Sequence, residues 1–178
     1  MRSFKIVVTG PFSAGKTTFI RTISEIAIVS TERAISDATR RVKTETTVAM
    51  DFGRITISKD IVLYLFGTPG QERFDFMWQI LSEGMLGYIL MLDASRPETF
   101  QEGRRILEFF STLSDAPFVV GATRIPEDQD REEVIEKIRK ELNIDGDVQV
   151  IPCNALDKED VKKVLLGLLY DILKTLDK

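Results

Sequence analysis

Short segments of apolar or alternating character recur along the chain, and longer amphipathic segments separate them. The short segments predict strands over residues 4–9, 47–57, 61–66, 86–93, 118–122 and 148–151. The longer segments predict helices over residues 17–28, a stretch after Arg73, 97–113, 131–142 and 158–176. Strands that alternate with helices are typical of a three-layer α/β fold, here a mostly parallel six-stranded sheet flanked by about five helices.

The last amphipathic segment carries a wide apolar stripe at helical spacing. Its members are Val161, Val164, Leu165, Leu168, Leu169, Ile172, Leu173 and Leu176. The stripe would suit either packing against the sheet or a leucine-zipper partner. We favour packing against the sheet, because the stripe is wide and lasts barely two heptads.

No internal repeat, low-complexity tract or domain boundary is visible, so residues 1–178 are expected to form a single domain. The apolar fraction of 43% and charged fraction of 29% are those of an ordinary globular chain. A compact fold of this size buries roughly 70% of the surface that its unfolded chain exposes, so it needs no disulfide or structural metal for stability. The longest stretch without a predicted element is 28–44, and loops of such length are often functional.

Composition excludes several classes of chemistry. The chain has no histidine and one cysteine, which removes histidine-based triads, zinc enzymes and internal disulfides. We interpret Cys153 as a small buried residue rather than a redox group. The net charge of −4 argues against a nucleic-acid-binding surface. We expect a cytoplasmic protein without a direct membrane anchor, because no apolar run approaches 20 residues and no lipidation signal is visible.

The strongest motif follows the first predicted strand. It reads Gly10-Pro11-Phe12-Ser13-Ala14-Gly15-Lys16-Thr17-Thr18, and a predicted helix comes directly after it. In this strand–loop–helix context the pattern predicts a phosphate-binding loop. Backbone amides and the helix N-terminus would face a phosphate, with Ser13, Ala14, Gly15 and Thr18 in the loop. Lys16 would add a charge, and Thr17 would hold Mg²⁺.

Two further motifs lie at matching distances from the loop. They are Thr47-Val48-Ala49-Met50-Asp51-Phe52 and Gly67-Thr68-Pro69-Gly70-Gln71-Glu72-Arg73-Phe74. With them the chain resembles the Ras-like small GTPases, which have a P-loop NTPase fold. The sequences of its motifs are most similar to those of prokaryotic small GTPases of the gliding-motility and roadblock-associated type. The resemblance covers nearly the whole chain and implies a single G domain that binds GTP or GDP with Mg²⁺.

Carried over residue by residue, the resemblance implies that Thr47 ligates magnesium and senses the terminal phosphate, with Thr44 and Thr46 as near alternatives. It implies that Gly70 binds phosphate and that Gln71 orients the attacking water, as the corresponding glutamine does in Ras. Alternatively, Thr47 is only the polar first residue of a strand. An arginine from a partner accelerates such reactions, so the isolated protein is expected to be slow. Arg40, Arg41 and Arg73 are candidates in cis, although a solvated charge is the simpler interpretation of each.

Phe12 also predicts slow hydrolysis. It lies in the phosphate loop, where a bulky side chain could approach the terminal phosphate or the attacking water. The alternative is that its side chain turns outward onto a neighbouring loop. The sequence leaves both interpretations open.

The chain departs from the family pattern at the metal and at the base. Gly67 replaces an aspartate that steadies magnesium, so weaker but not abolished magnesium binding is expected. The base motif Asn-Lys-x-Asp reads Thr123-Arg124-Ile125-Pro126, and its carboxylate is lost. Thr123 would replace the asparagine, and the stem of Arg124 would stack on the base. Glu127 or Asp128 could replace the lost acid, although solvent-facing residues before a helix are the simpler interpretation of both. The last box reads Asn154-Ala155-Leu156, and the Ala155 amide would face a purine oxygen beside Leu156.

Aromatic residues crowd the segment after Gln71. Phe74, Phe76, Met77 and Trp78 indicate either a switch-dependent partner surface or core positions of a helix. The leading hypothesis is therefore a magnesium-dependent guanine-nucleotide switch with slow GTP hydrolysis. The resemblance implies a regulatory or effector partner, such as a roadblock-type domain, near Thr47 and Phe74–Trp78. The alternatives are a non-catalytic module that holds nucleotide, or a nucleotidase with relaxed base specificity.

Overall fold

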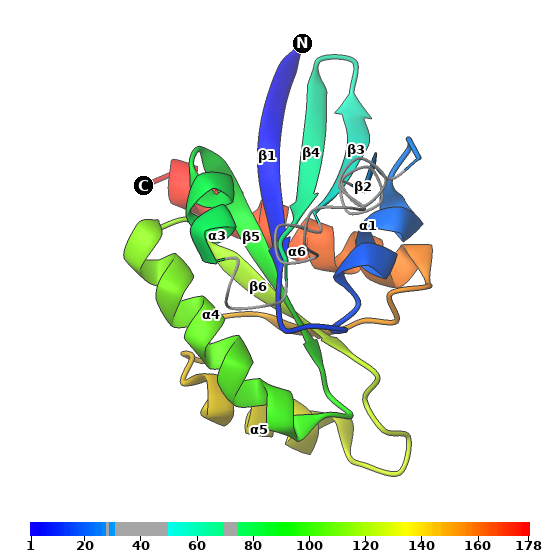
Figure 1. The fold of residues 1–178 in the computed structure, drawn as a ribbon, viewed down its shortest axis with the longest axis vertical. Coiled ribbons are helices and arrows are strands. Elements are labelled where there is room, and N and C mark those ends of the chain that lie inside the picture. Colours follow the sequence, from blue (N-terminus) through cyan, green and yellow to red (C-terminus); the bar gives the residue numbers. More distant parts are fainter. Residues whose placement is uncertain (28, 31–49, 70–74) are drawn as a thin grey trace, which may run out of the picture.

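The computed structural model describes residues 1–27, 29–30, 50–69 and 75–178. The elements in chain order are β1 (Arg2–Thr9), α1 (Lys16–Ile23), β2 (Val29–Ser30), β3 (Asp51–Ser58), β4 (Ile61–Gly67), α3 (Asp75–Ser82), β5 (Met85–Asp93), the 3₁₀ helix η3 (Pro97–Thr99), α4 (Phe100–Leu113), β6 (Phe118–Thr123), α5 (Arg131–Leu142), β7 (Val150–Pro152) and α6 (Lys158–Leu176). Figure 1 shows them in one sheet with helices around it. The predicted α/β fold is confirmed.

The sheet has the strand order β2-β3-β4-β1-β5-β6-β7 within the described residues. Pairing is parallel from β4 through β1, β5 and β6 to β7, and antiparallel where β3 meets β2 and β4. The six predicted strands are all represented, and β2 adds two residues at the edge beside β3. Crossover helices allow the parallel pairing that the alternating pattern predicts.

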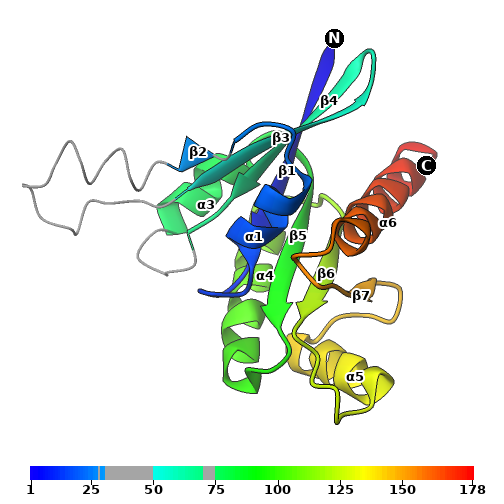
Figure 2. The ribbon, with the colours of Figure 1, turned by 90° about the vertical axis from the view of Figure 1, so that its right-hand side faces the viewer.

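Alternation along β1 divides the core into two layers. Ile6 and Val8 pack with apolar residues of α1 and α6, whereas Val7 packs with those of α3, α4 and α5. Figure 2 shows α4 and α6 on opposite sides of β5 and β6. Successive strand side chains point to opposite faces, so a strand buried on both sides reads as a continuous apolar run.

Helix α1 ends at Ile23 and not at Ile28 as predicted. Ser24 has an extended backbone. Its hydroxyl donates to the Ile26 carbonyl and accepts from the Ile26 amide, and it also accepts from the Arg54 amide at 3.1 Å. The Glu25 amide donates to the Arg54 carbonyl at 2.8 Å. Serine competes with helix geometry by such local bonds. The chain after α1 is thereby fixed to β3.

Other boundaries differ by a few residues. The helix predicted from Pro97 begins as the 3₁₀ turn η3, and α4 continues it to Leu113. Strand β7 begins at Val150 and not at Val148, because the Val148 amide bonds to Asp145 in a turn. The strand predicted from Thr47 is described from Asp51, since residues 47–49 lie outside the described residues.

The stripe on α6 packs against the sheet over most of its length, as predicted. Val161, Val164 and Leu168 are fully buried. Leu173 and Leu176 are exceptions at 60% and 70% exposed. A helix of 19 residues is about 28 Å long, whereas the six residues of β6 span about 20 Å. The stripe therefore extends further than the strand beneath it.

The carboxyl ends of the parallel strands meet at one edge of the sheet. They are Thr9, Gly67, Asp93, Thr123 and Pro152, at the ends of β1, β4, β5, β6 and β7. Ligands of open α/β sheets bind outside this edge. It is also the edge on which the phosphate loop lies.

Candidate functional site

The loop between β1 and α1 has the conformation that its glycines allow. Gly10 and Gly15 have positive φ values of 144° and 101°, and Ser13 joins them at 63°. A Cβ atom at Gly10 would lie 2.2 Å from the Met91 carbonyl oxygen, so residue 10 has room only for glycine. The loop thus curls against β5 and leads directly into α1, which confirms the strand–loop–helix context.

Lys16 is the first residue of α1 and is only 9% exposed. Its Nζ donates to the carbonyl oxygens of Gly10 at 2.5 Å and Pro11 at 2.9 Å. Burial lowers the pKa of Lys16 to about 8, against the attraction of the Glu102 and Asp51 carboxylates. The loop is therefore wrapped around a buried ammonium group. A bound phosphate would replace the two carbonyl oxygens as the partner of this group.

A cavity of about 700 Å³ opens beside this loop. Its lining includes Gly15, Thr18, Thr123, Arg124, Ala155 and Leu156, so it joins the phosphate loop to the ends of β6 and β7. All four predicted base-binding residues lie there, together with two predicted phosphate-binding ones. The volume is within the usual range for small-molecule sites. Leu156 is 79% exposed and contributes the rim.

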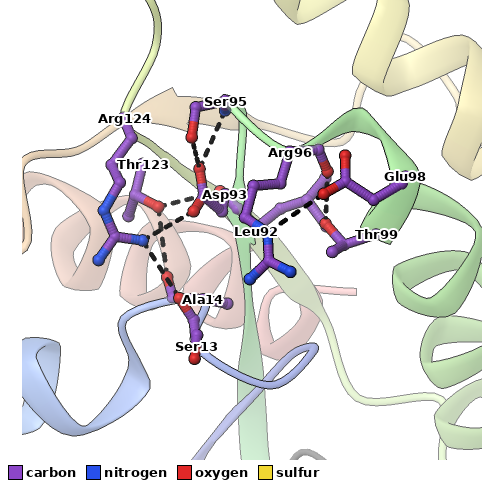
Figure 3. Close-up of polar contacts among 10 residues, drawn as sticks. All are labelled: Ser13, Ala14, Leu92, Asp93, Ser95, Arg96, Glu98, Thr99, Thr123 and Arg124. Carbon is purple, nitrogen blue, oxygen red and sulfur yellow. Dashed lines mark hydrogen bonds and ion pairs between the residues drawn. The ribbon is translucent and has the colours of Figure 1, made fainter.

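Two of these residues hold the phosphate loop (Figure 3). The Thr123 hydroxyl lies 3.2 Å from the carbonyl oxygens of both Ala14 and Leu92. Arg124 donates to the Ser13 carbonyl at 3.1 Å and to Asp93 Oδ2 at 2.8 Å. The Arg124 guanidinium is thus a tether between the loop and the end of β5. This leaves the aliphatic stem of Arg124 to contact a base.

Asp93 completes this network from the end of β5. Its side chain is 6% exposed and accepts from Arg124 and, through Oδ1, from the Ser95 amide and hydroxyl at 2.9 and 2.6 Å. Its charge is thereby paired and hydrogen-bonded, as a buried carboxylate requires. Sequence reasoning assigned Asp93 no role, although a charged residue ending a buried strand was the available signal.

The base end of the cavity holds carboxylates other than the family's. Glu127 lines the cavity, as one of the two predicted alternatives, whereas Asp128 is not among its lining residues. Asp160 lines it as well and accepts from the Asn154 amide at 2.9 Å. Sequence reasoning missed Asp160, which lies in the first turn of α6 just after the Asn154-Ala155-Leu156 box. Acidic acceptors are therefore present although Pro126 supplies none.

On the phosphate side, Thr17 of α1 contacts a carboxylate from strand β3. Its hydroxyl donates to Asp51 Oδ2 at 2.5 Å, and Asp51 pairs with Gly67 across β3 and β4. Hydroxyl and carboxylate oxygens are donors that Mg²⁺ prefers, so this donor set fits the ion. Thr17 would hold it together with phosphate oxygens, and the ion would neutralise phosphate charge. Thr47, the other predicted ligand, lies outside the described residues.

The predicted hydrolytic residue, Gln71, also lies outside the described residues, as do Gly70, Phe74 and the arginines at 40, 41 and 73. The described segment before them is attached to β1. The Thr68 amide donates to the Val8 carbonyl at 2.9 Å, and the Thr68 hydroxyl donates to that of Thr9 at 2.8 Å. Phe12 is 64% exposed and is not a lining residue of the cavity.

Trp78 is a core residue and not part of an exposed patch. It is 4% exposed, its indole donates to the Pro69 carbonyl at 2.9 Å, and its ring lies 5.4 Å from that of Phe109. It lies on the side of α3 that faces α4, which explains its burial. Phe76 on the same helix is 51% exposed. Among the described residues of the expected partner surface, Phe76 is exposed and Met77 is half-buried.

Cys153 is buried at 4% exposure, which confirms its interpretation as a small core residue. Burial, with Asp160 and Asp157 nearby, raises the pKa of its thiol to about 12. The thiolate, which is the reactive form, is therefore scarce at neutral pH.

A family model described as conserved hypothetical ATP binding protein matches residues 27–175. The chain belongs to this family. The family is described as ATP binding, and the cavity beside the phosphate loop is the candidate site for a nucleotide.

The chain is also similar to several individual proteins. An uncharacterized protein of Methanocaldococcus jannaschii is 35% identical over 98 residues, which cover 55% of the chain and 56% of that protein. Ras-related protein Rab-8A of Pongo abelii is 26% identical, covering 98% and 81%. ADP-ribosylation factor-like protein 3 of Saccharomyces cerevisiae is 26% identical, covering 91% and 82%. These similarities support the Ras-like superfamily, while the narrower gliding-motility resemblance stays a prediction.

Among the described helices, none has the length and apolarity needed to cross a membrane.

Proposed function

We propose that the protein is a magnesium-dependent guanine-nucleotide switch of the cytoplasm that hydrolyses GTP slowly and is read by partner proteins. The observation that carries the proposal is the buried Lys16 in a loop that opens into a cavity of about 700 Å³. Similarity to Rab and Arf-like proteins over more than nine-tenths of the chain supports it. Thr123 and Arg124 hold this loop from the strand that would face the base.

The first test is calorimetric titration of nucleotide-stripped protein with GDP, GTP, ADP and ATP, each with and without Mg²⁺. Guanine nucleotides are expected to bind more tightly than adenine nucleotides. Lys16→Ala should abolish binding, because it removes the charge that pairs with phosphate. Lys137→Ala, an exposed lysine on α5, is the matched control. Unchanged affinity in Lys16→Ala would contradict the assignment of the phosphate loop.

A second candidate is a nucleotidase with adenine or relaxed specificity. It is favoured by Pro126 in place of the base-reading carboxylate and by the family's description as ATP binding. A lost polar pair can cost several powers of ten in selectivity. Equal binding of both purines would favour this candidate, whereas a clear guanine preference would point to Glu127, Asp160 or the Ala155 amide as the replacement contact.

Hydrolysis is tested through Gln71. Under the proposal, Gln71→Leu lowers the rate of GTP turnover and leaves nucleotide affinity unchanged, because this side chain acts on the attacking water. The measurement is single-turnover phosphate release, with Gln79→Leu on α3 as the control. Absence of turnover with and without candidate partners, including a roadblock-type domain, would instead favour a module that only holds nucleotide.

A further inference from the structure

The end of β4 has a glycine where a carboxylate is expected, and the neighbouring strand brings one to the same place. Gly67 and Asp51 face each other in the antiparallel register of β3 and β4. A Cβ atom at Gly67 would lie 3.3 Å from Asp51 Cβ and 3.5 Å from Asp51 Oδ2. The Asp51 carboxylate therefore occupies the space that a side chain at position 67 would enter.

Side chains at the two positions would crowd each other. The same Cβ atom at Gly67 would lie 2.9 Å from Ile20 Cδ1, so a side chain there is confined between α1 and Asp51. An aspartate at both positions would also place two negative charges against each other, which disfavours ionisation of both. One carboxylate fits at this point of the sheet, and in this chain it comes from β3.

The carboxylate has a defined partner. Thr17 Oγ1 donates to Asp51 Oδ2 at 2.5 Å, across 34 positions of sequence. A hydroxyl has one proton and two lone pairs. When the proton is donated to Asp51, the lone pairs of Thr17 remain for a cation. Thr17 follows Lys16 in the first turn of α1, beside the phosphates that the loop would bind.

We infer that Asp51 is the carboxylate that orients the magnesium-binding hydroxyl of Thr17, in place of a residue at the end of β4. The inference rests on the proposed function, because nucleotide phosphates would complete the ligands of the ion. Asp51 is a positioning residue that acts through Thr17. Groups that hydrogen-bond to metal ligands typically contribute 10- to 100-fold to metal affinity. Gly67 by itself then does not weaken magnesium binding.

The first experiment measures metal affinity directly. Wild type, Asp51→Asn and Asp51→Ala are saturated with GDP, and Mn²⁺ as the probe is titrated by electron paramagnetic resonance. We expect both Asp51 variants to bind Mn²⁺ about 10- to 100-fold more weakly. Asp60→Asn, which removes the same charge from the far turn of the β3–β4 hairpin, should bind as wild type does. Circular dichroism and thermal unfolding confirm that each variant is folded.

The second experiment moves the carboxylate. Asp51→Gly should lose Mn²⁺ affinity, and adding Gly67→Asp to it should restore most of the loss, because the new side chain enters the space that Asp51 leaves. A merely structural role for Asp51 does not predict this rescue. Equal Mn²⁺ affinity in wild type and Asp51→Asn, or no rescue in the folded double variant, would overturn the inference.

GDP affinity in EDTA separates this inference from the proposed function. If wild type binds no nucleotide in either condition, the proposed function fails and the inference fails with it. If GDP binds in EDTA equally to wild type and Asp51→Asn while only the variant loses Mn²⁺ affinity, both stand. If Asp51→Asn weakens GDP binding equally with and without metal, Asp51 supports the loop itself and the inference alone is overturned.

Discussion

Lys16 carries the positive charge that a phosphate site needs, but its buried position disfavours that charge. The side chain is buried and its ammonium rests on two carbonyls, so desolvation lowers its pKa to about 8. At neutral pH the group is still protonated and ready for a phosphate. The two carbonyls and the Glu102 and Asp51 carboxylates offset part of the energy that burial costs, and a bound anion would offset more of it.

This shift predicts how stability depends on pH. Between about pH 8 and 10.5 the unfolded chain keeps a proton on Lys16 that the folded protein has released. Unfolding then takes up a proton, so the free energy of unfolding attributable to Lys16 rises with pH in this window, and below pH 8 the cost is present in full. Urea denaturation should show about 2 kcal/mol more gain between pH 7.5 and 9.5 for nucleotide-free wild type than for Lys16→Met. Equal gains would contradict the lowered pKa.

Individual residues also show what sequence reasoning can find. Lys16, Thr17 and Thr123 were found because a motif fixes their spacing. Asp51 and Asp93 were not assigned roles, because their partners Thr17 and Arg124 come from other elements, 34 and 31 positions away in sequence. The packing of α1 against β3 brings the first pair together, and the register of β5 and β6 brings the second.

At the scale of elements, the apolar periodicity predicted the strands and helices because each buries one or both faces. The end of α1 escaped prediction, since the bonds of Ser24 and Glu25 to β3 are tertiary ones. The phosphate loop itself depends on a close approach to β5 at Gly10. Its shape is therefore a property of two elements.

Glycine substitutions should separate crowding from backbone conformation. Gly10→Ala places a methyl group against the Met91 carbonyl at positive φ and should cost on the order of 3 kcal/mol. Gly84→Ala has positive φ but open space, and should cost about 1 kcal/mol. Gly146→Ala has neither obstacle and should be close to neutral. Thermal or urea unfolding measures all three, and a neutral Gly10→Ala would contradict the described loop.

The tether from Arg124 should matter for nucleotide binding as well as for folding. Arg124→Ala removes the charged partner of Asp93, whose side chain is only 6% exposed, so stability should fall by about 1–3 kcal/mol. Loss of the bond to Ser13 loosens the loop, and GDP affinity should fall about 3- to 10-fold. Arg104→Ala breaks an exposed pair with Glu108 on α4 and is the control. Equal GDP affinity in both variants would argue against the tether.

At the scale of the whole molecule, the cavity lies where separate parts of the chain meet. Its lining comes from the loop before α1 and from α1, from the ends of β6 and β7 with the segments after them, and from α5 and α6. A nucleotide bound there would contact residues that are more than a hundred positions apart in sequence. Binding is therefore expected to stabilise the fold as a unit.

A ligand at 100 times its dissociation constant adds about 2.7 kcal/mol to stability. For a chain of this size the midpoint of thermal unfolding should rise by roughly 5–10 °C with GDP and Mg²⁺. Lys16→Ala should show no rise, and Lys137→Ala should behave as wild type does. Scanning calorimetry gives the answer, and a rise in Lys16→Ala would place the ligand elsewhere.

The chain contains one tryptophan, and its position makes it an optical reporter. Trp78 is buried, and its indole donates to the carbonyl of Pro69, a residue of the Gly-Thr-Pro-Gly-Gln motif. Indole emission is sensitive to burial and to such a bond. Under the proposed switch, a displacement of Pro69 would alter the emission, and the nucleotide state could then be followed by the intrinsic fluorescence of the protein, without a label.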